Sequence, residues 1–541
     1  MKKHLKFIVI TGGVISGIGK WVAGASVWFF LSEHHKVVPI KLDGYLNVDP
    51  WTMNPQEHGE VFVLKDGAEV DMDFGHYERF LWIECETSQS ITMGRVYKGI
   101  LEKERRGDFL GKTVQMIPHV TDYIIHRIEK VVQNLKGDIC LLEVGGTVWD
   151  LEAELYIEAI RQLKLKTPRH DFLHIHLTYV PIPHGVNEQK TKPTQQSIQL
   201  LQSRGLFPDI IFARGEEMLT ENSRKKIALF SNLNEGNIFS LPDVKSIYTI
   251  PELLNKQGFQ KKLSSLLQIK DFSKKKSTIW NKLLEGKVKK QVRIGIIGKY
   301  TALEDSYGSV IEAIKHASFH FQIQPVIEFI NTRDWIDIEI LKNYDGLIVP
   351  GGFWKIGIEP MIVALKFARE HRIPTLWICL GLQLMMIEYF RNIIGVKKAT
   401  SLEFDEKTKF DVITLLDWQA QVIDKGGTMR LGGQKSILKK WIIKELYKEA
   451  ARVDSDDMVN ERFRHRFEVN PNYLEKLENS PLKIIGKSEK EWIVQFIEMD
   501  SKTHPYFVGT QSHPELTSKL ENPAPLFMGL VKASVGKNYS K

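Results

Sequence analysis

One cysteine has the sequence surroundings of a nucleophile. Cys379 follows the strand-like run 373–378 and precedes a helical stretch. A residue at such a junction lies on a tight turn, which exposes its sulfur, and the helix N-terminus favours the thiolate. His513 and Glu515 are two positions apart, so on an extended segment their side chains point to the same side. We expect Glu515 to hold the imidazole of His513, which acts as the base for Cys379.

The neighbours of Cys379 provide the rest of such a site. The backbone N–H of Leu380 and one from 350–352 (Pro-Gly-Gly) would form an oxyanion hole for a tetrahedral intermediate. A nucleophile on this kind of turn usually has small residues two positions to either side, and Gly381 obeys that rule whereas Trp377 does not. A lone buried cysteine is most often inert packing, but the combined pattern indicates a glutaminase.

A glycine-rich loop near the N-terminus suggests phosphate binding. The apolar run 7–11 leads into Gly12 and Gly13, and the loop ends at Lys20. Glycines let backbone N–H groups face a phosphate, and a lysine at the helix start adds positive charge. Trp21 stands where a standard P-loop has the Ser or Thr that binds magnesium.

Two carboxylates could complete a Mg–ATP site. Glu143 ends the buried strand-like run 138–143, where nucleotide hydrolases hold a metal-binding acid, and Asp73 lies in a turn-rich segment. Taken singly, each acid is more often a structural or surface group. The segment 190–195 packs two lysines, two hydroxyls and an amide around a proline, which suits a triphosphate but is also typical of a polar loop.

The chain is long enough for more than one domain. Its 541 residues alternate strand-like and helical runs, the α/β pattern of parallel sheets. A fresh α/β unit begins near Val292, and apolar periodicity is lost at about 271–290. We therefore predict one domain over 1–270, a linker over 271–290 and a second domain over 291–541.

Composition limits the alternatives. The net charge of +8 comes from scattered lysines, and the run at 274–276 favours a solvated linker over a nucleic-acid patch. The apolar runs are too short to span a membrane. The basic N-terminus continues directly into a strand instead of a cleavable signal, which predicts a cytoplasmic protein. Three cysteines without a CxxC pair do not indicate a disulfide framework.

Long strings carry a family resemblance. They are 41–43 (Lys-Leu-Asp), 47–50 (Asn-Val-Asp-Pro), 58–62 (His-Gly-Glu-Val-Phe), 75–80 (Gly-His-Tyr-Glu-Arg-Phe), 103–108 (Lys-Glu-Arg-Arg-Gly-Asp), 190–195, 426–432 (Gly-Gly-Thr-Met-Arg-Leu-Gly) and 464–468 (Arg-His-Arg-Phe-Glu). On these residues the sequence resembles the CTP synthase family over essentially its whole length. The resemblance implies an N-terminal P-loop-type amidoligase domain with a parallel sheet and a C-terminal class I glutamine amidotransferase domain, both α/β.

The resemblance also implies a reaction and its partners. ATP would phosphorylate O4 of UTP, and ammonia from glutamine would cross between domains and displace the phosphate to give CTP. The family is typically a homotetramer with Mg²⁺, CTP as feedback inhibitor and GTP as activator of the glutaminase. His58 and Val61 match the region where ammonia passes.

Site residues carry over by position. The ATP contacts match Ser16, Gly17, Ile18, Gly19, Lys20, Trp21, Val22, Lys41, Asp73, Asp243 and Val244. The UTP and CTP contacts match Ser16, Asp150, Leu151, Glu152, Lys190, Thr191, Lys192, Pro193, Thr194, Gln195 and Lys226. The glutamine pocket matches Gly352, Leu380, Gly381, Leu382, Gln383, Glu403 and Arg466. Asp73 and Glu143 match the magnesium ligands.

The chain departs from the family at several tight positions. Trp21, Trp51, Trp149 and Trp354 stand where the family generally has glycine. We expect that Trp377 also stands where the family has glycine. Overpacking a tight site typically costs about 1–3 kcal/mol. Trp21 would crowd ATP, and Trp354 would disturb activation by GTP. Three hypotheses remain open: an active CTP synthase, an impaired homologue that binds nucleotides or assembles, and a different P-loop amidoligase.

Overall fold

The structure is a computed structural model that describes residues 5–50, 53, 55–270, 280, 290–301, 303–353, 355–416, 419, 429–490 and 493–537. The chain forms two compact units. The first unit comprises Met1–Pro50 and His76–Asn281, and the second comprises Trp51–Gly75 and Lys282–Lys541. The predicted linker 271–290 falls almost entirely outside the described residues, so the predicted domain boundaries remain a prediction.

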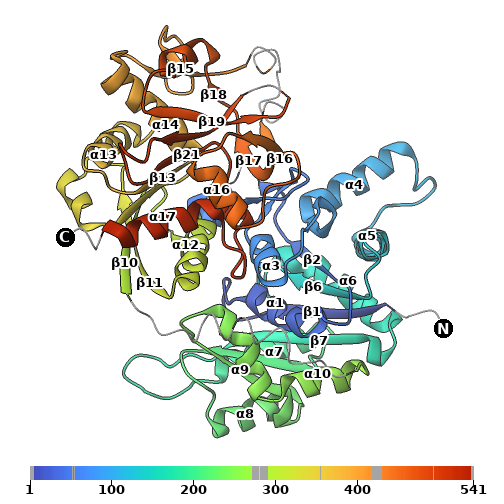
Figure 1. The fold of residues 1–541 in the computed structure, drawn as a ribbon. Helices are drawn as coiled ribbons and strands as arrows, with labels where there is room; N and C mark the ends of the chain where they lie inside the picture. The colour runs from blue at the N-terminus through green and yellow to red at the C-terminus, as the bar shows by residue number, and fades with distance from the viewer. Residues whose placement is uncertain are drawn as a thin grey trace. The chain divides into compact units, whose positions relative to one another are not determined.

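The first unit is built on a seven-stranded sheet in the order β5-β2-β6-β1-β7-β8-β9. Figure 1 labels the central strands β2, β6, β1 and β7. Every neighbouring pair of strands is parallel. The strands are β1 (Lys6–Gly12), β2 (Val37–Asp43), β5 (Ser90–Thr92), β6 (Ile139–Val144), β7 (Phe172–Tyr179), β8 (Ile210–Gly215) and β9 (Ile238–Pro242). These runs are almost wholly buried because a parallel sheet is covered on both faces.

Helices cover both faces of this sheet. They are α1 (Lys20–Leu31), α4 (Met93–Arg106), α5 (Thr121–Asn134), α6 (Glu154–Lys166), α7 (Lys192–Ser203), α8 (Glu221–Ser231), α9 (Ile250–Lys256) and α10 (Phe259–Leu267). One core joins α4, α5 and α6 to the face that carries Val9, Ile40 and Leu142. Helix α1 packs on the opposite face, where Gly24 approaches Ile10. Helix α3 (Asp73–Leu81) crosses the boundary between the two units.

The second unit contains a nine-stranded mixed sheet in the order β11-β10-β12-β13-β21-β20-β19-β16-β17. Its strands are β10 (Lys290–Gly298), β11 (Ile323–Asn331), β12 (Gly346–Val349), β13 (Thr375–Ile378), β16 (Arg430–Leu438), β17 (Met458–His465), β19 (Leu482–Ser488), β20 (Val494–Met499) and β21 (Phe507–Thr510). The first five strands in this order are parallel and the others antiparallel. The prediction of α/β architecture is confirmed.

Smaller elements complete the second unit. Its helices are α2 (Pro55–His58), α12 (Gly308–His320), α13 (Ile358–Glu370), α14 (Leu380–Tyr389), α16 (Ile442–Glu449) and α17 (Pro525–Lys537). Strands β14 (Thr400–Ser401), β15 (Asp411–Thr414) and β18 (Glu468–Val469) form a three-stranded sheet, and β3 (Val61–Val63) pairs with β4 (Glu69–Asp71). Helices α13 and α14 pack in one core of the large sheet, and α12, α16 and α17 pack in the other.

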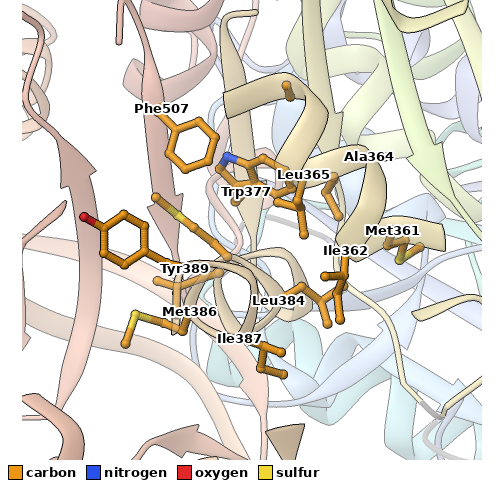
Figure 2. Close-up of a cluster of buried hydrophobic side chains, with 14 of the residues drawn as sticks. Met361, Ile362, Ala364, Leu365, Trp377, Leu384, Met386, Ile387, Tyr389 and Phe507 are labelled. Atoms are coloured by element: carbon orange, nitrogen blue, oxygen red, sulfur yellow. The ribbon is translucent and has the colours of Figure 1, made fainter. Parts of the chain in front are cut away.

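Trp377 is part of the core that α13 and α14 form. Its side chain is completely buried, and its ring lies 5.3 Å from that of Phe507. Figure 2 shows the indole among apolar side chains of this cluster, near Phe507 and Leu365. The large side chain is therefore accommodated by the core beside the turn. A Cβ on Gly381 would lie 3.3 Å from the Cβ atom of Trp377.

Replacing Trp377 should measure this packing. We expect Trp377→Ala to destabilise the second unit by about 3–5 kcal/mol, because a fully buried indole leaves a large cavity. Hydrogen-exchange mass spectrometry along a urea titration, read on peptides from α14, measures the loss. Trp335→Ala is the control: Trp335 is 72% exposed, and its loss should cost less than about 0.5 kcal/mol. Equal losses in both variants would contradict the described packing.

Candidate active site

The structure places Cys379 on the junction between β13 and α14, as the sequence predicts. Its backbone has φ 53° and ψ −102°, a region that residues with a β-carbon rarely adopt. Its N–H donates to Thr510 O at 2.7 Å, which holds the turn against the neighbouring strand β21. Gly381 completes the turn: a Cβ atom there would lie 2.5 Å from Val349 O. The close approach of strand and helix at this turn therefore requires glycine at position 381.

His513 and Glu515 come together beside this turn. His513 Nδ1 lies 2.7 Å from Glu515 Oε1. The sequence suggested an extended segment, but this expectation is wrong, because Pro514 begins a short 3-10 helix that includes Glu515. Proline restricts φ to helical values and thereby favours that turn. A Cβ on Gly351 would lie 2.7 Å from His513 Cε1 and 3.4 Å from Cys379 Cβ, so the three residues are adjacent.

The charges in this group support an imidazolium at position 513. Burial lowers the pKa of His513, but the charges of Glu515 and Cys379, with hydrogen bonds from both, raise it well above its ordinary value. His513 can then pass its proton to a leaving amine.

A second group of residues shapes the predicted oxyanion loop. Tyr300 Oη donates to Phe353 O at 3.2 Å and accepts from Phe353 N at 3.3 Å. This pair of bonds fixes the backbone just after Gly352. A Cβ on Gly352 would lie 3.1 Å from Lys299 Cε and 3.3 Å from Leu380 Cδ2, so glycine lets the loop lie close to α14.

A cavity of about 630 Å³ opens beside Cys379 in the second unit. Of the residues predicted for catalysis and glutamine binding, Gly352, Cys379, Glu403, Arg466, His513 and Glu515 line it. The predicted residues Leu380, Gly381, Leu382 and Gln383 are buried and are not part of the lining. Gln383 instead donates through Nε2 to Phe467 O at 2.9 Å, so it supports the pocket wall.

Sequence reasoning missed several residues of this cavity. Tyr300, Phe353 and Arg464 line it, and Arg464 pairs with Glu69 at 2.6 Å. The string 464–468 contained Arg464, but nothing in the sequence showed that it contacts a residue almost four hundred positions earlier. Val61 of the β3–β4 hairpin also lines the cavity, whereas His58 is exposed on α2.

Lys299 adds an unforeseen charge close to the glutamine pocket. Burial lowers the pKa of Lys299 to about 8, with Glu403 opposing the shift and Arg333 adding to it. The negative charge of Glu403 thus stabilises the ammonium of Lys299. No motif in the sequence pointed to Lys299, which directly follows β10.

The first unit gathers the predicted nucleotide residues at one edge of its sheet. The loop 13–19 follows β1, Lys41 is near the end of β2, Glu143 is near the end of β6, and Asp243 and Val244 follow β9. The segment 150–152 also follows β6, and 190–195 lies between β7 and the first turn of α7. All these strands are parallel, so their carboxyl ends lie at the same edge, the usual place for ligands in such sheets. Lys226 lies on α8, where it is exposed.

The glycine loop carries backbone strain and a folded-back lysine. Val14 has φ 79°, a conformation that costs a β-branched residue free energy and tends to occur at functional sites. Gly17 and Gly19 also have positive φ. Lys20 Nζ donates to Gly146 O at 2.8 Å, which holds it beside the turn after β6.

Glu143 is buried within a cluster of polar groups. Lys41 Nζ lies 3.5 Å from Glu143 Oε1 and 3.5 Å from Asp43 Oδ1, and Tyr77 donates to Glu143. Asp73 begins α3 and belongs to the second unit. Within the part of the chain that the structure describes, no three His, Cys, Asp or Glu residues are grouped closely enough to hold a metal.

The predicted UTP and CTP residues already have partners. Asp150 accepts from Thr147 Oγ1 at 2.8 Å, while Leu151 and Glu152 are exposed. Lys190 pairs with Glu188 at 2.6 Å, and Gln195 donates to Thr191 Oγ1 at 3.0 Å. Thr194 Oγ1 donates to Tyr179 O at 2.9 Å, while Lys192 is exposed. Asp243, one of the predicted ATP contacts, pairs with Arg214 at 2.6 Å.

The tryptophans that depart from the family pattern lie in different surroundings. Trp21 stacks on His76 with ring centroids 3.5 Å apart and planes 8° from parallel. Trp149 is 41% exposed. Trp51 and Trp354 lie outside the described residues.

These features define a class of protein. A cysteine on a strained strand–helix turn, with a His–Glu pair beside it, is the arrangement of a glutamine amidotransferase, here in one chain with a parallel-sheet unit that carries a glycine-rich phosphate loop. The sequence model for the CTP synthase N-terminus matches residues 6–269, and the model for class I glutamine amidotransferases matches residues 302–533.

Relatives cover both units. The chain is 47% identical over 544 residues to the CTP synthase of Borreliella burgdorferi, covering 99% of this chain and 100% of the relative. It is 44% identical to the CTP synthase of Sulfurisphaera tokodaii, covering 98% of this chain and 99% of the relative. The chain belongs to the CTP synthase family. A solved glutaminase domain of Trypanosoma brucei CTPS with bound acivicin is 29% identical and covers 45% of this chain and 94% of that chain, with a TM-score of 0.41.

The pH dependence of glutamine hydrolysis should report the charge beside His513. Glu515→Gln removes a negative charge that raises the pKa of His513, so the imidazolium should lose its proton at lower pH. We expect the alkaline limb of kcat/KM for glutamine hydrolysis to move to lower pH and the maximum rate to fall. Glu406→Gln, which changes another carboxylate of the same cavity, is the control and should leave the limb in place. An unmoved limb in Glu515→Gln contradicts this assignment.

Proposed function

We propose that the protein forms CTP from UTP, with ATP as co-substrate and glutamine as the nitrogen source. The observation that carries this proposal is the match to CTP synthases along the whole chain, at 47% identity, in a sequence that keeps Lys20, Lys41, Cys379, His513 and Glu515. The family assignment leaves no support for a different amidoligase. No described residue favours the impaired homologue.

The second unit would supply ammonia. The Cys379 thiolate attacks the side-chain amide carbon of glutamine, and the oxyanion forms near the N–H groups of Leu380 and the 351–352 loop. The imidazolium of His513 gives its proton to the departing nitrogen, which leaves as ammonia. Water, deprotonated by His513, then hydrolyses the thioester to glutamate. Arg466 and Glu403 line the cavity, where they would pair with the α-carboxylate and the α-amine of glutamine.

The first unit would activate UTP. The γ-phosphoryl group of ATP passes to O4 of UTP, ammonia then adds at C4, and inorganic phosphate leaves to give CTP. Lys20 and Lys41 lie beside the phosphate loop and the end of β2, where their charges would stabilise the transferring phosphate. The polar cluster of Lys190 to Gln195 would bind the triphosphate of UTP.

Mg²⁺ would be held by Asp73 and Glu143. The oxygen-only character of these carboxylates fits magnesium, and the burial of Glu143 beside Lys41 gives it a fixed orientation. Bound magnesium would neutralise charge on the phosphates of ATP.

Regulation and assembly are proposed on the same basis. CTP would act as feedback inhibitor at the segment 150–152, which is largely exposed. A homotetramer would cover exposed apolar side chains, among them Leu101, Leu110 and Met116. GTP would activate the glutaminase.

Among the described residues no helix has the length and apolar character to cross a membrane. The proposed location of the protein is the cytoplasm.

Parallel assays with two nitrogen sources test the proposal. The protein with ATP, Mg²⁺ and UTP should form CTP with either glutamine or ammonium chloride. Cys379→Ala should abolish the glutamine reaction and keep the ammonia reaction within about twofold, because the thioester is needed only to release ammonia. Cys85→Ala, which removes a buried thiol of the first unit, is the control and should keep both reactions. If the folded wild-type protein forms no CTP with either nitrogen source, the proposal is wrong.

Replacing Lys20 should impair CTP formation without impairing glutamine hydrolysis. We expect Lys20→Ala to lower CTP formation about 100-fold or more with either nitrogen source, because one charged donor is lost from the transferring phosphate. Basal glutamine hydrolysis at Cys379 should persist. The exposed Lys166, changed to alanine, serves as the control. CTP formation in Lys20→Ala at the control's rate would refute this role.

A further inference from the structure

Strand β7 carries polar side chains deep inside the first unit. His174 and His176 alternate along it on the same face, and both are completely buried. Thr11 at the end of β1 and Ser197 on α7 are also completely buried. Buried polar groups destabilise a fold unless they are hydrogen-bonded, so this group calls for an explanation.

The four side chains form one hydrogen-bonded chain. Thr11 Oγ1 lies 2.9 Å from His174 Nε2 and 2.9 Å from His176 Nδ1. His176 Nε2 lies 2.7 Å from Ser197 Oγ. Burial, with a smaller contribution from the charge of Lys20, lowers the pKa of His176 to about 3, so the ring is neutral near pH 7. A neutral imidazole has one N–H donor and one acceptor nitrogen, and His176 therefore bonds a hydroxyl at each end.

This series of hydrogen bonds links two parts of the proposed nucleotide site. Thr11 directly precedes the glycine loop, and Gly13 N donates to Leu177 O of β7 at 3.0 Å. A Cβ on Gly13 would lie 1.7 Å from Ser197 Oγ, so the loop backbone rests directly against Ser197. Ser197 is three residues after Thr194 on α7, or about 4.5 Å along the helix axis.

His174 lacks this connection. It contacts the same threonine from the same strand, but only His176 reaches α7. If the histidines served packing alone, apolar side chains of similar size would fill the space without needing partners. The bond that distinguishes His176 is the one that joins the phosphate loop to the helix of the 190–195 cluster.

We propose that His176 is a positioning residue that fixes the glycine loop against α7 and thereby sets the alignment of ATP with UTP for phosphoryl transfer. This inference rests on the proposed function. Each nucleotide keeps its own binding contacts when the link is lost, but the reacting atoms shift. Misplacement by about 1 Å can cost up to about 100-fold in rate. Loss of the link should therefore lower kcat and change KM little.

Two substitutions at position 176 separate the bond to Ser197 from the bond to Thr11. His176→Gln keeps a polar group near the position of Nε2 and can still reach Ser197, whereas His176→Asn keeps one near Nδ1 and can reach only Thr11. His174→Asn is the matched control, because it breaks a buried bond to the same Thr11 without touching α7. Each full-length variant is assayed for CTP formation from ammonium chloride, with KM for ATP and for UTP, and its unfolding temperature is measured.

We expect His176→Asn to lower kcat tenfold or more with both KM values within about threefold, and His176→Gln to recover most of the rate. His174→Asn should keep kcat within about twofold of the wild-type value, even if its unfolding temperature falls as far as that of His176→Asn. Loss of kcat in parallel with unfolding temperature across all three variants overturns the inference, as does a defect confined to KM. If the wild-type protein forms no CTP from ammonia, it is the proposed function that fails.

Discussion

Both candidate sites depend on a glycine that lets the backbone lie unusually close to a neighbouring element near the carboxyl end of a parallel strand. At the end of β13 the turn of Cys379 closes only because Gly381 leaves room for Val349 O. At the end of β1, Gly13 lets the phosphate loop rest against Ser197. The strain at Cys379 and Val14 is tolerated because the surrounding strands hold the chain on both sides. Each sheet thus stabilises a local conformation that the isolated segment would not keep.

The tight turn explains how the second unit accepts a tryptophan beside its nucleophile. The requirement for a small residue applies where a side chain would enter the gap between strand and helix. The Cβ atom of Trp377 lies beside Gly381, and its indole packs in the core with Phe507. The size of a residue near a nucleophile is therefore less informative than the direction in which its side chain leaves the backbone.

Charge is distributed differently in the two units. In the second, Glu515 keeps His513 protonated beside Cys379, and the ion pair of Arg464 with Glu69 ties the cavity wall to the β3–β4 hairpin. In the first, Glu143 is matched by Lys41, whereas the histidines behind the loop stay neutral. Beneath the glycine loop, the hydrogen bonds of His174 and His176 to Thr11 are therefore bonds between uncharged groups.

The sequence by itself determined the α/β class, the strands that lead to Gly12, Glu143 and Cys379, and the residue types that could do chemistry. Alternation of apolar runs and glycine turns is a short-range property, so it can be read locally. It could not show that Pro514 starts a 3-10 turn under Glu515, that the 61–71 hairpin packs with the glutaminase unit, or that Lys299 lies beside Gly352. Those facts depend on strand order, which brings together residues hundreds of positions apart. For the same reason only the tertiary structure joined His176 to Ser197: the bond exists because β7 lies beside β1 with α7 packed against it.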